Sequence, residues 1–236
     1  MEIPDEDDKW RIAEGSHGGV AQSALESAES YIATSTGAGG AGDGGGETFT
    51  AAFTALIDWG VARKLILPER DFAFFQRAPD GYGNEHEAWF DEESNRWFKA
   101  TFPNRFGLAW GRDGTATAHE YLARLILQNK HFGDDIRLVA LVECKQHLRV
   151  LTSQPHIAGE PASQEEIGNW FHRLGFVRLQ TGGSVAWYRS EENLLVADAH
   201  EGNVIREAGG GLVPIDLNIV QPMGKLAEWV AGAIED

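Results

Sequence analysis

The sequence predicts an α+β fold in which helices and β-hairpins follow one another along the chain. Apolar residues recur at helical spacing in the segments 48–65, 117–126, 164–174 and 222–234. Between these segments lie pairs of short β-rich runs, each pair joined by turn-forming residues. Hydrophobic residues make up 42% of the 236 residues, which is an ordinary globular value and suffices for one or two domains.

Charge and composition exclude several classes of protein. The formal net charge of −16 argues against a protein that coats nucleic acid or an anionic membrane. No run approaches the roughly 18 apolar residues of a membrane span. A single cysteine, Cys144, cannot form an intramolecular disulfide, and the acidic start does not resemble a secretory signal. We therefore expect a cytoplasmic protein without nucleic-acid or membrane partners.

The N-terminal segment 1–48 differs from the rest of the chain. An acidic tail leads to a stretch, 20–33, in which Leu25, Ala28 and Ile32 fit a short amphipathic helix. The following Gly-rich run, 37–46, lacks the Gly-Lys-Ser/Thr ending of a nucleotide-binding loop. We expect an acidic arm and a flexible linker that are dispensable for folding, followed by one domain over residues 49–236.

A glycine-containing hairpin opens the strand-rich part of this domain. Residues 71–77 are aromatic and strand-like, and the hairpin that follows carries Gly81 and Gly83. The next strand, 96–101, bears Lys99 between Phe98 and Ala100, so alternation turns Lys99 away from the face of Phe98. Lys99 either faces solvent on a half-exposed strand or belongs to a polar site.

The next helix begins near Thr117 and contains Glu120. Thr117 and Glu120 have the spacing of a capping box, so one role for Glu120 is to cap its own helix. The other role, which we favour, is to pair with Lys99. Two β-rich runs, 135–142 and 146–153, then form a hairpin that leads into an extended segment around Pro155.

Three side chains that can serve as metal ligands lie close together in the sequence near the end of the chain. Asp198 follows the apolar run 194–197, Asn203 lies five residues on, and Asp216 follows a short hairpin. Their hard oxygen atoms suit Mg²⁺. Asp, Asn and Gly are also common in ordinary turns, so turn residues of an unrelated α+β domain are an alternative. An Asp and an Asn five residues apart are found in the catalytic loop of protein kinases.

In order, these motifs resemble the polyvalent-protein kinase domain, a compact kinase-like family of phages and mobile elements. The Asp-Ala-His-Glu-Gly-Asn sequence also resembles the catalytic loop of aminoglycoside phosphotransferases and choline kinases. The resemblance covers about residues 49–222. The motifs are specific when they are taken together in this order, whereas any one of them alone is a weak signal. The matching motifs are Gly83-Asn84-Glu85-His86, Lys99, Glu120-Tyr121-Leu122, Phe132-Gly133-Asp134-Asp135, Ser153-Gln154-Pro155-His156-Ile157, Asp198-x4-Asn203 and Pro214-Ile215-Asp216.

The resemblance implies a minimal two-lobed protein-kinase-like fold with a sheet-rich N-lobe and a reduced C-lobe. The expected boundaries are 49–152 for the N-lobe, 153–159 for the hinge and 160–236 for the C-lobe. Lys99 would hold nucleotide phosphates and Glu120 would anchor Lys99. Asp198 would be the catalytic aspartate, with Asn203 and Asp216 as Mg²⁺ ligands. The remaining nucleotide-binding residues would be Gly81, Gly83, Gln154, His156 and Ile157.

The implied function is ATP- and Mg²⁺-dependent transfer of the γ-phosphoryl group to a hydroxyl acceptor. The acceptor, a protein or a small molecule, is not identified by the sequence. The alternative is a pseudokinase or nucleotide-binding interaction module of a phage or mobile element. The third glycine of a Gly-x-Gly-x-x-Gly loop is replaced by His86, which favours that alternative, whereas the complete set of polar positions favours the enzyme.

Overall fold

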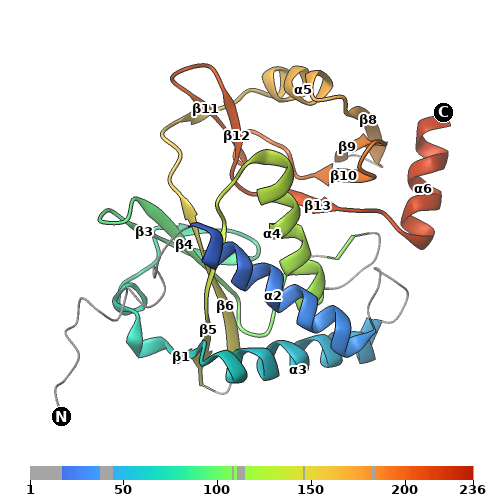
Figure 1. The fold of residues 1–236 in the computed structure, drawn as a ribbon. Coiled ribbons are helices and arrows are strands. Elements are labelled where there is room, and N and C mark those ends of the chain that lie inside the picture. Colours follow the sequence, from blue (N-terminus) through green and yellow to red (C-terminus); the bar gives the residue numbers. More distant parts are fainter. Residues whose placement is uncertain are drawn as a thin grey trace, which may run out of the picture.

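The computed structural model describes residues 18–37, 45–107, 109–110, 115–145, 147–181 and 184–235. An N-terminal lobe is built on a six-stranded sheet, and a C-terminal lobe is built on two smaller sheets (Figure 1). The helices are α2 (Gly18–Thr36), α3 (Gly45–Arg63), α4 (Ala118–Phe132), α5 (Gln164–Arg173) and α6 (Gly224–Glu235). The predicted α+β class is therefore confirmed. In the part of the chain that the structure describes, none of the helices is both long and apolar enough to span a bilayer.

The N-lobe sheet has the strand order β1-β5-β6-β4-β3-β2, with β1 parallel to β5 and the other pairs antiparallel. In this register Lys99 of β4 lies between Ala88 of β3 and Thr152 of β6. The lysine is thus placed in the interior of the sheet. The strands are β1 (Ile66–Pro68), β2 (Gly81–Tyr82), β3 (His86–Asp91), β4 (Arg96–Thr101), β5 (Arg137–Cys144) and β6 (His147–Pro155).

The two faces of this sheet are covered differently. Helices α2, α3 and α4 share one hydrophobic core with β5 and β6. The other face packs against two 3-10 turns, η1 (Glu69–Asp71) and η2 (Ala73–Gln76), where a strand was expected. The strand prediction is wrong because Phe72, Phe74 and Phe75 gather around Trp89, with the Phe75 and Trp89 ring centroids 4.8 Å apart.

Helix α2 is a packed part of the N-lobe. Its carboxylate Glu29 lies 2.8 Å from His119 Nε2 on α4. A flexible arm was expected here, and for residues 18–36 that expectation is wrong, because the apolar stripe of α2 finds partners on α3 and α4 (Figure 1). The acidic tail before residue 18 and the Gly-rich residues 38–44 lie outside the described residues. Of the α2 side chains that the structure describes, Leu25, Ala28 and Ile32 are fully buried.

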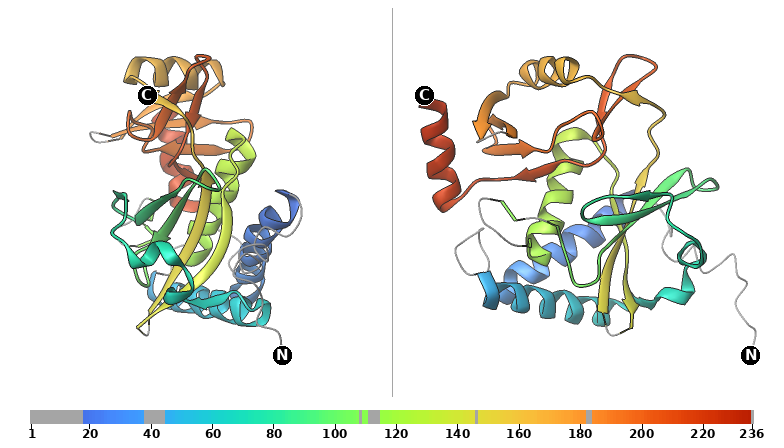
Figure 2. Two further views of the ribbon diagram at one scale, coloured as in Figure 1. Left: turned by 90° about the vertical axis from the view of Figure 1, so that its left-hand side faces the viewer. Right: turned by 180° about the vertical axis from the view of Figure 1, so that it is seen from behind.

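The chain crosses to the C-lobe over residues 156–158, a shorter connection than the expected hinge of 153–159. One sheet has the order β13-β10-β9-β8 and the other the order β12-β11-β7. Figure 2 shows α5 and α6 on the outside of this lobe, with α4 between the two lobes. The strands are β7 (Gly159–Pro161), β8 (Val177–Thr181), β9 (Ser184–Arg189), β10 (Leu194–Ala197), β11 (Val204–Glu207), β12 (Leu212–Pro214) and β13 (Asn218–Val220).

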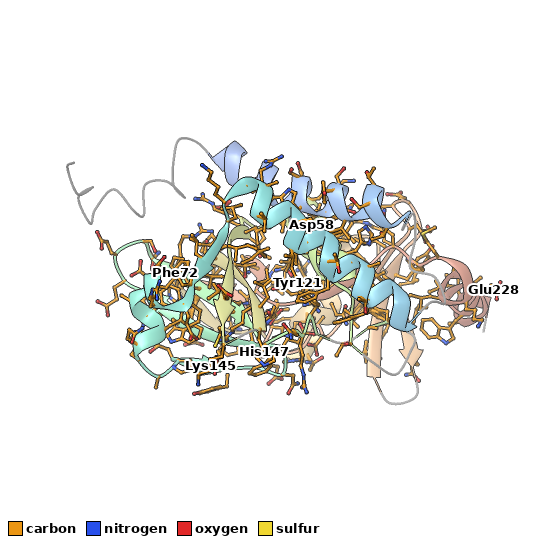
Figure 3. The ribbon with its side chains drawn as sticks, turned by 90° about the horizontal axis from the view of Figure 1, so that it is seen from below. Asp58, Phe72, Tyr121, Lys145, His147 and Glu228 are labelled. Atoms are coloured by element: carbon orange, nitrogen blue, oxygen red, sulfur yellow. The ribbon has the colours of Figure 1, made fainter. Side chains whose placement is uncertain are left out.

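Helix α4 begins after the capping residue that the sequence indicates. Thr117 and Glu120 form a complete capping box, and Gly133 ends the helix in the left-handed conformation with φ of 69°. Its inner face includes Tyr121, which is 1% exposed and lies in the middle of the molecule, whereas Glu228 lies at the far end on α6 (Figure 3). This helix contacts α2 at one end and the C-lobe strand β13 at the other, so it spans both lobes.

Candidate nucleotide and metal site

Lys99 and Asp216 meet where the two lobes face each other. The Nζ atom of Lys99 donates a hydrogen bond to the Ile215 carbonyl at 2.9 Å and lies 3.9 Å from Asp216 Oδ2. The Lys99 side chain is 18% exposed and that of Asp216 is 44% exposed. Of the two possibilities for Lys99, the structure therefore supports the polar site rather than a solvent-facing lysine. An ammonium and a carboxylate at this separation can bind an anion and a cation side by side.

Asp198 and Asn203 are joined by their side chains at the end of β10. Asn203 Nδ2 donates to the Asp198 carbonyl at 2.9 Å and to Asp198 Oδ2 at 3.1 Å. Asp198 has a φ of 61°, a conformation that turns the chain sharply after the strand. Its side chain remains 63% exposed, so the carboxylate is available to a ligand.

His200 supports the Asp198 carboxylate from the other side. Its Nδ1 accepts the Gly202 N–H at 3.0 Å, so in the neutral ring Nε2 carries the proton. Nε2 lies 3.4 Å from Asp198 Oδ1. The two carboxylate oxygens of Asp198 therefore face one donor each, Asn203 on one side and His200 on the other. Such contacts orient a carboxylate without removing its charge.

The turn that carries Asp216 is tied to the Asp198 loop and to α4. The Ile215 N–H donates to the Asn203 carbonyl at 2.8 Å, and the Leu217 N–H donates to Gln128 Oε1 at 3.1 Å. Burial acts to raise the pKa of Asp216, but nearby positive charge, first that of Lys99, holds this pKa below its usual range. Asp216 is thus a carboxylate at neutral pH.

The oxygen atoms at this turn fit a hard cation such as Mg²⁺. The amide nitrogen of Asn203 is engaged with Asp198, which leaves Asn203 Oδ1 as the oxygen for a ligand role beside Asp216. Across the described ranges, no group of three or more His, Cys, Asp and Glu side chains forms a metal site. A magnesium ion here would therefore need oxygens from phosphate and water, as Mg²⁺ commonly has in nucleotide sites.

The β2–β3 hairpin lies on the same side of the sheet as Lys99. The Gly83 N–H donates to the His86 carbonyl at 2.9 Å, which closes the turn. A Cβ at Gly81 or at Gly83 would meet its nearest described atom at 3.9 or 3.8 Å, an ordinary contact distance. Neither glycine is required by packing against the described residues.

His86 and Glu85, at the place of the third glycine, belong to the protein interior. His86 is 6% exposed, and its Nε2 lies 2.9 Å from the Tyr121 hydroxyl. Burial, as the largest effect, lowers the pKa of His86 to about 4. Glu85 forms an ion pair with Arg124 of α4. Both residues therefore fix the hairpin against α4.

Glu120 takes the capping role, so the expected pair with Lys99 is not formed in the structure. Its Oε2 accepts the Thr117 N–H at 2.7 Å, and its own N–H donates to Thr117 Oγ1 at 3.2 Å. Within the residues that the structure describes, the carboxylate in ion-pair distance of Lys99 is that of Asp216. The capping contact of Glu120 is formed with a residue three positions away in the same helix. A pair with Lys99 would instead require Glu120 to reach strand β4, which is distant in the sequence.

Two of the three predicted hinge residues are engaged with other parts of the N-lobe. Gln154 is 4% exposed within β6, and its Nε2 donates to Asp134 Oδ2 at 2.5 Å. The His156 N–H donates to the Asn95 carbonyl at 3.0 Å, and His156 Nδ1 accepts the Trp97 indole N–H at 3.1 Å. Adenine recognition through the N–H of His156 would require this contact to open. Ile157 lies half-buried in the crossover itself.

Two polar residues beside this site, Asp134 and Gln128, are not among the site residues that the sequence predicts. Asp134 follows the end of α4, and burial, as the largest effect, raises the pKa of its carboxyl group. Gln128 donates to Asp134 Oδ2 at 2.7 Å and accepts from the Leu217 N–H, so it connects the end of α4 to the Asp216 turn. The signal for Asp134 was present in the Phe132-Gly133-Asp134-Asp135 motif.

The fold and this arrangement of polar groups define a kinase-like domain. A family described as serine/threonine/tyrosine kinase found in polyvalent proteins matches residues 54–220, which is more than half of the chain. The protein therefore belongs to the polyvalent-protein kinase family. The resemblance to the polyvalent-protein kinase family and the kinase-like α+β fold are both confirmed. Comparisons with curated proteins and with solved structures find no match.

Proposed function

We propose that the protein is an ATP- and Mg²⁺-dependent phosphotransferase that moves the γ-phosphoryl group to a hydroxyl acceptor. The observation that carries this proposal is the meeting of Lys99 with the Asp216 turn, and of that turn with the Asp198–Asn203 pair. These residues supply the phosphate-binding cation, two ligands for the metal and the carboxylate for the acceptor that phosphoryl transfer requires.

The assigned roles follow from the position of each group. Lys99 binds the nucleotide phosphates, while Asn203 Oδ1 and the carboxylate of Asp216 hold the metal. Bound Mg²⁺ would neutralise charge on the phosphate oxygens. Asp198, held by Asn203 and His200, orients the acceptor hydroxyl and receives its proton. The acceptor oxygen forms a bond to the γ-phosphorus, and the bond from this phosphorus to the bridging oxygen of ADP breaks.

The proposal is tested by incubation with γ-labelled ATP, with and without Mg²⁺, followed by measurement of label on the protein, on added acceptors and in free phosphate. We expect Mg²⁺-dependent release or transfer by the wild type. Asp198→Asn should lower that rate about a hundredfold or more. Glu191→Gln is the matched control, because this exposed residue lies near the opposite end of β10 from Asp198 and should leave the rate unchanged.

Two results contradict the proposal in different ways. Full activity of Asp198→Asn would show that Asp198 is an ordinary turn residue. Nucleotide binding by the wild type, without transfer to any acceptor or to water, would make the protein a nucleotide-binding module instead.

A further inference from the structure

The helix that packs beside Lys99 does not supply it with a carboxylate. Glu120 is the single acidic residue in α4, whose sequence is AHEYLARLILQNKHF, and it closes the capping box. The inner face of α4 carries Tyr121, Arg124 and Gln128, which contact the hairpin and the Asp216 turn. Asp216 is the present partner of Lys99, but as a metal ligand it would have to share its carboxylate between the lysine and the cation.

The Asp134 carboxylate accepts hydrogen bonds from uncharged donors on three neighbouring residues. Its Oδ2 accepts hydrogen bonds from Gln128 Nε2 at 2.7 Å and from Gln154 Nε2 at 2.5 Å. Its Oδ1 accepts the Asp135 N–H at 2.8 Å. A carboxylate has about four acceptor positions, so the three bonds from described residues leave one for a further donor.

Two independent chains of contacts connect Asp134 to the surroundings of Lys99. Lys99 pairs with Thr152 across β4 and β6, and Gln154 is the next residue of β6 on the same face. The amide of Gln154 therefore reaches Asp134 on the side of the sheet to which Lys99 points. The second connection runs through Gln128, which bonds both Asp134 and the Leu217 N–H. Lys99 donates to Ile215 of the same turn.

We propose that Asp134 is the positioning carboxylate of Lys99 in the nucleotide-bound protein. Lys99 exchanges its contacts with the Ile215 carbonyl and Asp216 for the phosphates, and Asp134 then holds its ammonium group at the phosphates. This inference rests on the proposed function, because it names the partner of the phosphate-binding lysine. Burial, as the largest effect, raises the pKa of Asp134, and after the hydrogen bonds to Asp134 the positive charge of Lys99 also acts to lower this pKa.

The test compares two neighbouring substitutions that each remove one negative charge. Asp134→Asn removes the proposed anchor. Asp135→Asn is the matched control, since Asp135 pairs with Arg96 at 3.0 Å and Arg137 at 2.7 Å. The amide oxygen of an asparagine can accept the hydrogen bonds of Gln128 and Gln154 in place of Asp134 Oδ2, so we expect Asp134→Asn to fold, which a thermal melt verifies.

Calorimetry of both variants is carried out with MgATP and with adenosine. The comparison separates an effect on phosphate binding through Lys99 from a general effect on nucleotide binding. We expect Asp134→Asn to bind MgATP about tenfold more weakly, the effect of one charge-assisted contact, and to bind adenosine like the wild type. Asp135→Asn should bind both ligands normally. An equal loss for both ligands, or no loss in Asp134→Asn, would overturn the inference. A wild type that binds no MgATP would overturn the proposed function itself.

Discussion

Arg124 and Glu85 form a buried bidentate ion pair, with Nη1 donating to Oε1 at 3.1 Å and Nη2 to Oε2 at 2.5 Å. The two side chains are 6% and 18% exposed. The pair joins the middle of α4 to the turn of the β2–β3 hairpin. In this protein the helix carries the cation and the hairpin carries the carboxylate, so the hairpin is held to α4 without using Lys99.

Substitution of one member of this pair should cost more stability than substitution of both. Glu85→Gln leaves the Arg124 charge buried beside a neutral amide, and we expect a loss of about 3 kcal/mol in the free energy of unfolding. The double variant Glu85→Gln with Arg124→Met removes both charges. Its loss should be smaller than the sum of the two single losses, as measured by urea denaturation. Additive losses would show that the two residues act separately.

Helix α2 should contribute directly to the stability of the N-lobe. Ile32 is fully buried, so Ile32→Ala should lower the free energy of unfolding by about 2–5 kcal/mol. The adjacent Tyr31 is 42% exposed, and Tyr31→Ala should change it by less than about 0.5 kcal/mol. Thermal or urea unfolding of the whole chain measures both. A small effect of Ile32→Ala would restore the view of this segment as a dispensable arm.

Burial of His86 should make the protein sensitive to mild acid. The pKa of His86 is lowered from 6.5 to about 4, chiefly by burial. Between these two pH values the unfolded chain binds a proton that the folded protein does not, so the free energy of unfolding falls as the pH falls. The loss attributable to His86 is roughly 3 kcal/mol over this window.

The variant His86→Gln isolates this contribution, because an amide can keep the hydrogen bond to Tyr121 without titrating near pH 5. Urea denaturation at pH 6.5 and pH 4 should show a steeper acid loss for the wild type than for the variant. Carboxylates titrate in both proteins, so only the difference between the two slopes is informative. Equal slopes would mean that His86 accepts a proton in the folded state.

Asp198 and Asp216 should respond differently to neutralisation. Asp216→Asn should weaken Mg²⁺-dependent nucleotide binding and turnover together, because its carboxylate is assigned to the metal. Asp198→Asn should lower turnover with little change in nucleotide affinity, because its carboxylate is needed chiefly in the transition state. Calorimetry and labelled-phosphate transfer on both variants measure the two effects. A large loss of nucleotide affinity in Asp198→Asn would contradict the assignment.

Sequence alone predicts the Asp198 loop well because the contacts there are local. Asn203 is five residues from Asp198 and bonds it directly, and Asp216 arrives on the next hairpin. The spacing in the sequence therefore fixes most of the geometry. The roles of these residues in catalysis stay predictions, to be tested by the variants above.

The partner of Lys99 and the packing of α2 could not be predicted in this way. Glu120 had two possible roles, and the choice depended on whether a bond within one helical turn or a contact across the lobe forms. The apolar stripe of α2 was visible in the sequence, but the surface that receives it comes from α3 and α4. Contacts between distant segments depend on the relative placement of whole elements, which residue spacing does not encode.

Gln128 connects the two lobes, because its side-chain amide forms hydrogen bonds with Asp134 in the N-lobe and with the Leu217 N–H in the C-lobe. Any motion that separates α4 from the Asp216 turn has to release the Leu217 amide to solvent. The hydrogen-exchange rate of the Leu217 amide therefore reports how often the two lobes separate.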